Sequence, residues 1–427
     1  MVNLEAIYKV FQQSTGVSTD SRKVKEGEMF FALSGPNFNG NTFAKSAVEQ
    51  GALTAVIDDS QYSDVDYLLV ENVLHTLQKL AKYHRQKMGI PIIALTGSNG
   101  KTTTKELMAA VLGKKFKVQF TQGNLNNHIG VPLTLLSIDT SHEIAIVEMG
   151  ANHLNEIADL CEIAQPDIGY ITNFGSAHLE GFGSKENIVS AKSELYRYLR
   201  NHDGSVLLNK SDVVQVSKAK DINSISFAFN QSANYEFEVA PDTDNATVWY
   251  SAHKIESQLI GDYNAANIAA AVSIGLHFQI PLEDIIQAVR EYNPSNHRSQ
   301  KISHGAKTII LDCYNANPSS MVAALSHFAH APGKKAVILG DMFELGEFSM
   351  AEHTKIAELV SNLDFHEILF VGEWFSQTKI AHPNLFKFRT MGELRSFLES
   401  TNLQSTQILV KGSRGMRMEE IEPLIKK

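Results

Sequence analysis

Residues 91–104 hold the side chains best suited to bind phosphate, in the order Pro-Ile-Ile-Ala-Leu-Thr-Gly-Ser-Asn-Gly-Lys-Thr-Thr-Thr. Glycines at positions 97 and 100 let backbone amides approach phosphate oxygens, and Lys101 supplies a point charge for β- and γ-phosphates. Thr102 is placed for the metal ion that accompanies those phosphates. The strict P-loop pattern requires glycine where this chain has Leu95, so the match is to the shorter variant Gly-x-x-Gly-Lys-Thr.

The elements around this segment must hold it in place. The apolar run PIIAL predicts a strand that ends at Leu95, and KTTTKELMAAVL predicts a helix that begins at Lys101. A helix N-terminus favours negative charge, which adds to the attraction for phosphate. The alternative is an ordinary glycine turn with a solvated Lys101. The strand before it, the helix after it and the three successive threonines favour the phosphate site.

Three further side chains could work beside the phosphates. Glu148 ends the apolar run EIAIVEM, where a carboxylate suits Mg²⁺, although a solvated loop glutamate is the alternative. His178 follows the strand-like run DIGYIT and could ligate a second ion or orient a group. A single loop histidine more often only makes hydrogen bonds. Lys192 in SAKSELY has, by spacing alone, the character of a surface helix lysine.

Strand-like runs alternate with helical periodicity along most of the chain, which predicts an α/β fold with parallel sheets and ligands at the carboxyl ends of the strands. The alternation restarts twice and suggests domains at residues 1–83, 84–297 and 298–427. Residues 205–254 contain short β-like segments, which we interpret as an antiparallel patch on the central domain.

Composition excludes several classes of protein. The 427 residues suit about three domains, and the net charge of −9 disfavours nucleic acid or an anionic membrane as a partner. The apolar run from Ile268 to Leu276 is too short to span a membrane and predicts a buried helix. Cys161 and Cys313 cannot make a disulfide framework, so we expect a reducing, cytoplasmic location.

Motifs in several parts of the chain resemble, in the same order, those of the Mur ligases. Within that family they are most similar to the branch that adds D-alanyl-D-alanine, and the resemblance covers nearly the whole chain. The motifs are STDSRKVKEGEMFFALSGPNFNG, TGSNGKTTT, EMGANH, NFGSAHLEGFGS, SAKSELY, GDYNAANIAAA, DCYNANPSSM, LGDMFELG and VKGSRGMRME.

The resemblance implies an ATP-dependent ligase that joins D-alanyl-D-alanine to the terminal carboxylate of UDP-N-acetylmuramoyl-tripeptide through an acyl phosphate, with Mg²⁺. It also implies a small uridine-nucleotide-binding domain, a central P-loop ATPase domain with a mostly parallel sheet, and a Rossmann-like C-terminal domain. We expect a monomer without nucleic-acid partners or membrane insertion. Alternatives are a MurE-type ligase, a folylpolyglutamate synthase, or an ATP-dependent switch that makes no bond.

The resemblance also assigns roles to individual residues. Lys101, His178 and Lys192 would be catalytic, and Lys192 would be carbamylated, which turns a cation into an anion. The metal ligands would be Thr102, Glu148, His178 and Lys192. The nucleotide would contact Thr96, Gly97, Ser98, Asn99, Gly100, Lys101, Thr102, Thr103, Asn267, Arg298 and Asp312. The muramoyl nucleotide would lie near Ser21, Arg22, Asn126 and Asn127.

Three positions depart from the family pattern. His297 stands where glycine is usual, which predicts a stiffer hinge beside Arg298. Cys313 stands where serine is common, and we assign it no chemistry. Asn41 occupies a position often held by histidine, so the sequence does not determine how uridine is recognised at this position.

Overall fold

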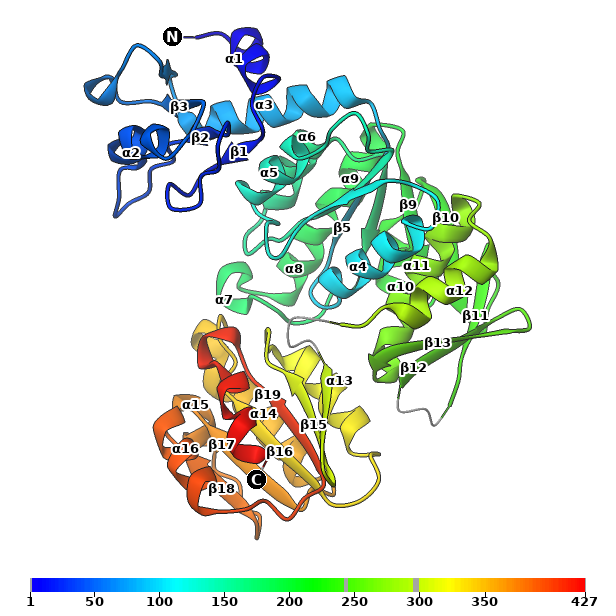
Figure 1. Cartoon of the computed structure of the whole chain (residues 1–427). Coiled ribbons are helices and arrows are strands. Elements are labelled where there is room, and N and C mark those ends of the chain that lie inside the picture. The colour runs from blue at the N-terminus through cyan, green and yellow to red at the C-terminus, as the bar shows by residue number, and fades with distance from the viewer. Residues whose placement is uncertain (1, 242–244, 295–298, 427) are drawn as a thin grey trace.

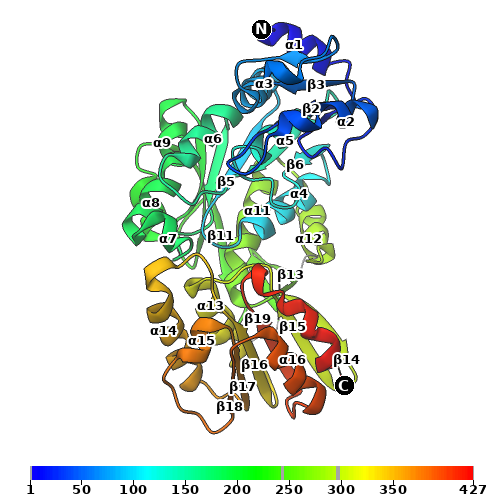
Figure 2. The ribbon, with the colours of Figure 1, turned by 90° about the vertical axis from the view of Figure 1, so that its left-hand side faces the viewer.

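The computed structural model describes residues 2–241, 245–294 and 299–426. Within these ranges the strands form three separate sheets that follow one another along the chain. Figure 1 and Figure 2 show the first sheet at one end of the molecule, the central sheet in the middle and the C-terminal sheet at the other end. Short 3-10 helices occur at Gly40–Phe43, Ser60–Tyr62, Asp262–Asn264, Gly346–Phe348, Arg414–Met416 and Met418–Ile421.

The first sheet is parallel, with the order β1-β2-β3-β4. The long helix α3 links it to the central part. His84 Nε2 lies 2.7 Å from the carbonyl oxygen of Ile138, and Arg85 Nη2 pairs with Asp167 at 2.9 Å. The elements are α1 (Leu4–Phe11), β1 (Val17–Ser18), β2 (Met29–Phe31), α2 (Ala44–Glu49), β3 (Thr54–Ile57), β4 (Leu68–Leu69) and α3 (Val73–Met88).

The central sheet has the order β13-β12-β11-β10-β9-β8-β5-β7-β6, and the strands from β5 to β11 all run parallel to one another. Its strands are β5 (Ile92–Thr96), β6 (Val118–Phe120), β7 (Ile144–Glu148), β8 (Ile168–Ile171), β9 (Ser205–Asn209), β10 (Asn223–Phe229), β11 (Tyr235–Val239), β12 (Asn245–Tyr250) and β13 (His253–Ile260).

The interpretation of residues 205–254 as an antiparallel patch was partly wrong. β9 pairs in parallel with both β8 and β10, and β10 pairs in parallel with β11. Only the pairs β11–β12 and β12–β13 are antiparallel among these strands. The helix α10 (Val213–Lys218) lies between β9 and β10 in the chain. It forms the crossover connection that two adjacent parallel strands require.

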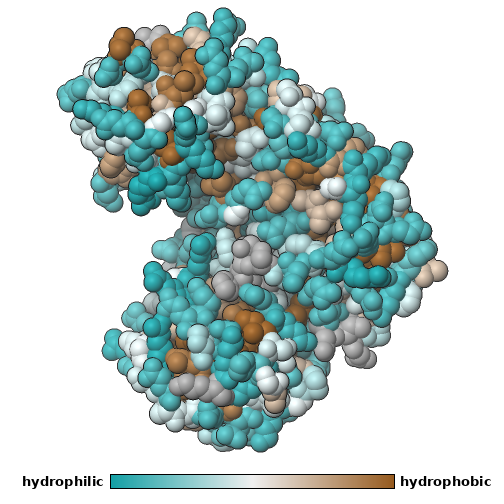
Figure 3. Space-filling model, viewed as in Figure 1, coloured by the Kyte–Doolittle hydropathy of each residue, from teal (hydrophilic) through white to brown (hydrophobic). Residues whose placement is uncertain are grey.

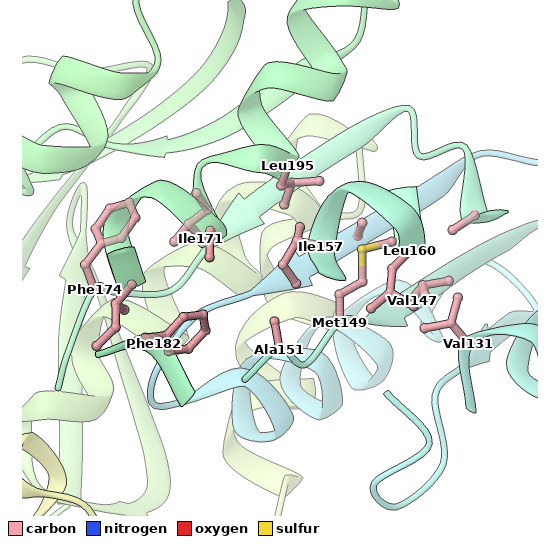
Figure 4. Packing of buried hydrophobic residues seen from close by; sticks show 14 of the residues in the cluster. Val131, Val147, Met149, Ala151, Ile157, Leu160, Ile171, Phe174, Phe182 and Leu195 are labelled. Carbon is pink, nitrogen blue, oxygen red and sulfur yellow. The ribbon is translucent and has the colours of Figure 1, made fainter. Parts of the chain in front are cut away.

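Helices cover both faces of the central sheet because its strands are apolar on both sides. Along β5, Ile93 and Leu95 face one hydrophobic cluster while Ile92 and Ala94 face another. Figure 4 shows part of the second cluster, to which Val147 and Ile157 belong. The remaining helices are α4 (Lys101–Leu112), α5 (Gly130–Leu136), α6 (Glu156–Ala164), α7 (Leu179–Phe182), α8 (Lys185–Lys192), α9 (Glu194–Asn201), α11 (Ala265–His277) and α12 (Leu282–Glu291).

The C-terminal sheet has the order β14-β15-β19-β16-β17-β18, with only the β14–β15 pair antiparallel among the described strands. Helices pack on both of its faces. The elements are β14 (Gln300–His304), β15 (Lys307–Asp312), α13 (Pro318–Phe328), β16 (Lys335–Gly340), α14 (Ser349–Ser361), β17 (Glu367–Val371), α15 (Glu373–Gln377), β18 (Leu385–Phe388), α16 (Met391–Ser400), β19 (Gln407–Lys411) and α17 (Glu422–Ile425).

The predicted domain divisions and the predicted buried helix can be compared with the structure. The predicted division at residue 83 falls inside α3, and that at residue 297 lies outside the described residues, so the division into domains stays a prediction. The predicted buried helix at 268–276 is confirmed within α11, whose Ile268 and Val272 are fully buried. Throughout the described ranges, every helix is too short or too polar to cross a bilayer.

Candidate active site

A cavity of about 1100 Å³ lies between the central and C-terminal parts. The space-filling view in Figure 3 shows the surface hollowed between the lobe of the first sheet and the lobe of the C-terminal sheet. The lining contains most of the predicted nucleotide, metal and substrate residues. They are Ser98, Asn99, Gly100, Lys101, Thr102, Thr103, Asn126, Asn127, Glu148, His178, Asn267 and Asp312.

The phosphate loop, residues 96–103, joins β5 to α4 as the sequence predicts. Gly97 has φ +146°, and a Cβ there would lie 1.9 Å from Thr172 Oγ1. Gly100 has φ +79°, and a Cβ there would lie 2.7 Å from Asn267 Oδ1. Both positions therefore need glycine, for the backbone conformation and for space. The alternative of an ordinary glycine turn does not explain this close fit against two other elements.

The first turn of α4 places its backbone N–H groups and two polar side chains at the cavity. Gly100 is the N-cap and has no side chain, so it leaves the helix N-terminus open to an anion. Lys101 Nζ donates to the carbonyl oxygen of Gly97 at 2.7 Å, which folds the lysine over the loop. Thr102 Oγ1 donates to Glu148 Oε2 at 3.0 Å. Thr96 ends β5 and is fully buried.

Glu148 ends β7 beside the phosphate loop and is 2% exposed. Its Oε1 accepts from Asn126 Nδ2 at 2.8 Å, and its backbone N–H donates to Thr121 Oγ1 at 3.0 Å. The fully buried Lys105 places Nζ 3.8 Å from Glu148 Oε2. Glu148 is thus a buried, oriented carboxylate, and the alternative of a solvated loop residue is wrong.

His178 is the N-cap residue of the short helix α7, with φ +54°, and pairs with the C-terminal part. Its Nδ1 lies 2.5 Å from Glu344 Oε2, and the backbone N–H of Glu180 donates to the carbonyl oxygen of Glu344 at 3.1 Å. The close pairing with His178 holds the pKa of Glu344 below its usual value. His178 therefore bridges the two sides of the cavity.

Lys192 is not a surface residue, as spacing alone had suggested, because it is only 1% exposed at the end of α8. Its Nζ lies 5.5 Å from the centre of the Phe182 ring. Burial, helped by the nearby charge of Lys101, lowers its pKa to about 7. An amine in that range is about half neutral at neutral pH, and its neutral form can act as a nucleophile.

Residues of α11 in the central part and of β15 in the C-terminal part complete the lining of the cavity. Asn267 Oδ1 accepts from Thr104 Oγ1 at 3.0 Å and packs against Gly100. Asp312 Oδ2 lies 2.5 Å from Nζ of the buried Lys411. Arg298 and the departure at His297 lie outside the described residues.

The three remaining substrate candidates and the other two departures from the family pattern lie elsewhere or play local roles. Arg22 is exposed in the first sheet region and bonded to Asp20 at 2.9 Å, next to the half-buried Ser21. Asn127 lines the cavity and its Oδ1 accepts from the backbone N–H of Gly130 at 2.9 Å. The other two departures from the family pattern are both buried. Asn41 Oδ1 accepts from the backbone N–H of Asp58 at 3.0 Å, and Cys313 is a free cysteine.

The donor set fits Mg²⁺ without forming a complete cage. Across the described ranges there is no group of three or more His, Cys, Asp or Glu side chains that could hold a metal. Mg²⁺ is usually bound through one or two carboxylates plus waters and substrate phosphates, so a complete cage is not needed. Thr102 and the buried Glu148 present hydroxyl and carboxylate oxygens side by side at the phosphate loop.

Sequence reasoning missed the residues whose role depends on a partner from another element. These partners come from distant segments, so no local spacing reveals them. They are Lys105 beside Glu148, Glu344 beside His178, Lys411 beside Asp312, and Asn317 and Ser319 beside Asn99. One signal was available, since Asn317 followed by Pro318 is typical of a helix start.

The fold and the cavity define an enzyme class in which a P-loop nucleotide site faces a second α/β domain. Sequence models of known families match all three parts of the chain. The Mur ligase middle domain matches residues 95–275, the Mur ligase glutamate ligase domain residues 297–414, and the Mur ligase family catalytic domain residues 13–92. The chain belongs to the Mur ligase family, which confirms the predicted family and fold class.

Individual relatives are similar over nearly the full length. The UDP-N-acetylmuramoyl-tripeptide–D-alanyl-D-alanine ligase of Bacillus subtilis is 33% identical over 422 residues, covering 95% of this chain and 92% of that protein. The Escherichia coli enzyme of that name is 33% identical over 423 residues, with the same coverage. A crystal structure of MurF from Acinetobacter baumannii superposes with a TM-score of 0.88 at 30% identity, covering 99% of this chain and 98% of that one.

Proposed function

We propose that this chain is the ligase that uses ATP to join D-alanyl-D-alanine to the terminal carboxylate of UDP-N-acetylmuramoyl-tripeptide, a step in peptidoglycan precursor synthesis. The observation that carries the proposal is the conjunction of a phosphate loop and a second α/β domain around one cavity. Relatives that bear this enzyme's name share about a third of their residues with the chain over 95% of its length.

The reaction must first make a carboxylate electrophilic. Transfer of the γ-phosphoryl group of ATP to the tripeptide carboxylate gives an acyl phosphate and ADP. The amine of D-alanyl-D-alanine then attacks the acyl carbon, and the tetrahedral intermediate expels phosphate to leave the new amide. The protein contributes mainly positioning and charge stabilisation to the first step.

In this proposal the phosphate loop binds the triphosphate. Backbone amides of the loop and the first turn of α4 contact the phosphates, and Lys101 leaves the Gly97 carbonyl to reach the γ-phosphate. Asn267 and Asp312 contact the rest of the nucleotide from α11 and β15, together with Arg298. The loop residues in this role are Thr96, Gly97, Ser98, Asn99, Gly100, Lys101, Thr102 and Thr103.

We place Mg²⁺ at the same site. Thr102 would hold one ion beside the phosphates, and Glu148, His178 and carbamylated Lys192 would serve a second. When bound, the ions supply charge stabilisation for the transferred phosphoryl group and the developing oxyanion. The burial of Lys192 supports its carbamylation, because a neutral amine is the form that adds to carbon dioxide.

The muramoyl nucleotide would extend from the cavity to the first domain. Asn126 and Asn127 lie at the cavity, and Ser21 and Arg22 would bind the far, nucleotide end. We expect the enzyme to act as a monomer in the cytoplasm, where ATP is available and the two buried cysteines remain reduced.

The experiment is phosphate release from purified protein with ATP and Mg²⁺, with mass spectrometry of the product. Separate tubes contain UDP-N-acetylmuramoyl-tripeptide, D-alanyl-D-alanine, or both. We expect release only with both substrates, together with a product of pentapeptide mass. Lysine and diaminopimelate tripeptides are both tested, because the sequence leaves the third residue open.

The same assay separates the alternatives. A MurE-type ligase or a folylpolyglutamate synthase would release phosphate with a single L-amino acid or glutamate and its own acceptor, and not with D-alanyl-D-alanine. An ATP-dependent switch would release phosphate without regard to either substrate. Either result would overturn the proposed function.

A further inference from the structure

The side chain of Asn99 connects the phosphate loop to the C-terminal part of the chain. Its Nδ2 donates to Ser319 Oγ at 2.8 Å, and its Oδ1 accepts from Asn317 Nδ2 at 2.7 Å. Ser319 Oγ also donates to Asn317 Oδ1 at 2.9 Å. Three side chains thus close a ring of hydrogen bonds between the loop and the start of α13, which we call the Asn99 ring.

The main chain of Asn99 is held separately, from within the central part. Its carbonyl oxygen accepts from Thr172 Oγ1 at 2.6 Å and from Asn173 Nδ2 at 3.0 Å. Its N–H donates to Asn173 Oδ1 at 3.1 Å. The backbone that would bind phosphate is therefore fixed by one domain, while the side chain on the same residue bonds to the other.

The C-terminal half of the ring is rigid. Asn317 is the N-cap of α13, where its Oδ1 accepts from the backbone N–H of Ser320 at 2.9 Å, and Pro318 follows at the first helical position. The reciprocal bond from Ser320 completes a capping box. Because the cap fixes the amide of Asn317, the ring forms only when the C-terminal part is docked in one position.

Gly175 gives independent support for close docking at this point. A Cβ there would lie 2.5 Å from Ser319 Oγ and 2.8 Å from Asn99 Nδ2. Both distances are shorter than side-chain carbons tolerate. The φ of Gly175 lies outside the left-handed region, so glycine is needed here for space rather than for backbone conformation.

We propose that Asn99 is a positioning residue that ties the phosphate loop to the docked C-terminal domain, so that phosphoryl transfer proceeds only when that domain is in place. The inference rests on the proposed function and assigns a positioning role within its site. Without the ring, nucleotide still binds to the central part, but Asp312 and Lys411 are no longer held over it. The side chain of Asn99 acts through the domain contact, and only its backbone contacts phosphate.

The test compares Asn99→Ala, Ser319→Ala and Gly175→Ala, with Ser326→Ala, an exposed serine on the same helix, as the matched control. We expect kcat for amide formation to fall about tenfold in each of the first three, the effect of roughly one hydrogen bond on a rate. The dissociation constant of a non-hydrolysable ATP analogue should rise by a smaller factor than kcat falls, because the phosphate loop still binds the phosphates when the contact from Asp312 is lost. Ser319→Thr, which keeps the hydroxyl, retains activity.

The double variant Asn99→Ala/Ser319→Ala decides whether the residues act as one unit. A shared ring predicts that the double variant loses no more activity than either single variant. Independent roles predict that the losses multiply to about a hundredfold, which overturns the proposal. Weaker analogue binding by Asn99→Ala with unchanged kcat also overturns it, because Asn99 would then be a phosphate ligand.

Small-angle X-ray scattering with the bound analogue separates this proposal from the proposed function. We expect a larger radius of gyration in Asn99→Ala and Gly175→Ala than in the unmodified protein and in Ser326→Ala. If the unmodified protein makes no amide, the proposed function fails. The scattering then still tests whether the Asn99 ring docks the C-terminal domain. Equal radii in all four proteins overturn the docking role, whatever the activity.

Discussion

The phosphate loop and the loop at residues 18–23 are built in opposite ways, although both are candidate sites for anionic parts of the substrates. The phosphate loop is fixed from several elements, with Thr172 and Asn173 bonded to its main chain. In the 18–23 loop, Arg22 bonds through both its side chain and its backbone to Asp20, and 85% of its side chain is exposed. This local pairing lowers the pKa of Asp20 to about 2.

The difference indicates where each site obtains its binding energy. The phosphate loop is in place before a ligand arrives, so little reorganisation opposes catalysis at the reacting end. In the 18–23 loop, Arg22 must leave Asp20 before it can contact a pyrophosphate. The loss of that ion pair offsets part of the free energy of binding. Substitutions in the first region should therefore affect the rate, and substitutions in the second should affect affinity.

The largest effect should come from Lys101→Ala, because this side chain is the charge nearest the loop carbonyls and would move to the γ-phosphate. We expect turnover to fall about a thousandfold or more, in line with the loss of a preorganised charge. Amide formation measures the rate, and circular dichroism checks the fold. Lys114→Ala is the control, because Lys114 is an exposed lysine in the turn that follows α4. Near-normal turnover with a normal spectrum would contradict the phosphate-loop assignment.

A loss of about a hundredfold or more is expected for Lys192→Ala, with partial rescue by added short carboxylates that replace the carbamate. Wild-type turnover in this variant would end the carbamate hypothesis. Crystallographic density or mass spectrometry of the unmodified protein would show the modification directly. The variant extends the comparison, since Lys192 is buried and its pKa is affected by Lys101 of the phosphate loop.

The pH dependence of stability provides a second test of Lys192. Its folded pKa of about 7 lies below the usual lysine value of 10.5, so the folded protein disfavours the charged amine. The destabilisation is complete below pH 7 and disappears as pH rises through 10.5. Lys192→Met should therefore raise the melting temperature more at pH 6 than at pH 10 in buffer free of carbon dioxide. An equal change at both pH values would contradict the depressed pKa.

Gly97→Ala should cost about a hundredfold in kcat/KM, because displacement of the loop by a fraction of an ångström misplaces the phosphates. The new methyl group would lie 1.9 Å from Thr172 Oγ1, in addition to the strain at φ +146°. Gly89→Ala is a matched control, with φ +64° and nothing within 4 Å of the added Cβ. If both variants lose the same activity, strain alone would explain the effect and the close fit would carry no role.

Local sequence signals predicted most of the framework of this site. The strand–glycine–helix pattern placed β5 and α4 correctly, because apolar periodicity and the glycines are properties of neighbouring residues. The position of Glu148 at a strand end also predicted a carboxylate beside the loop. Lys192 could not be placed in this way, since its burial depends on Phe182 and on helices that pack from other parts of the chain.

Contacts between distant elements were beyond prediction for the same physical reason. Asn99 was predicted only as part of the phosphate loop, and its bond to Ser319 joins residues 220 positions apart. The parallel course of β9 and β10 was also missed, because short β-like segments look alike in either direction. Pairing direction depends on the crossover through α10, which residue composition does not reveal.

The smallest effect is expected for Arg22→Ala, and it separates the two loops most directly. KM for UDP-N-acetylmuramoyl-tripeptide should rise about tenfold with kcat unchanged, the result expected when a contact far from the reacting atoms is lost. Stability should not change, because exposed ion pairs contribute little. Lys23→Ala, on the neighbouring exposed lysine, is the control, and Asp20→Ala should lower KM because it releases Arg22 for the substrate. A fall in kcat with unchanged KM would mean that the 18–23 loop acts on the reaction itself, and the contrast with the phosphate loop would no longer hold.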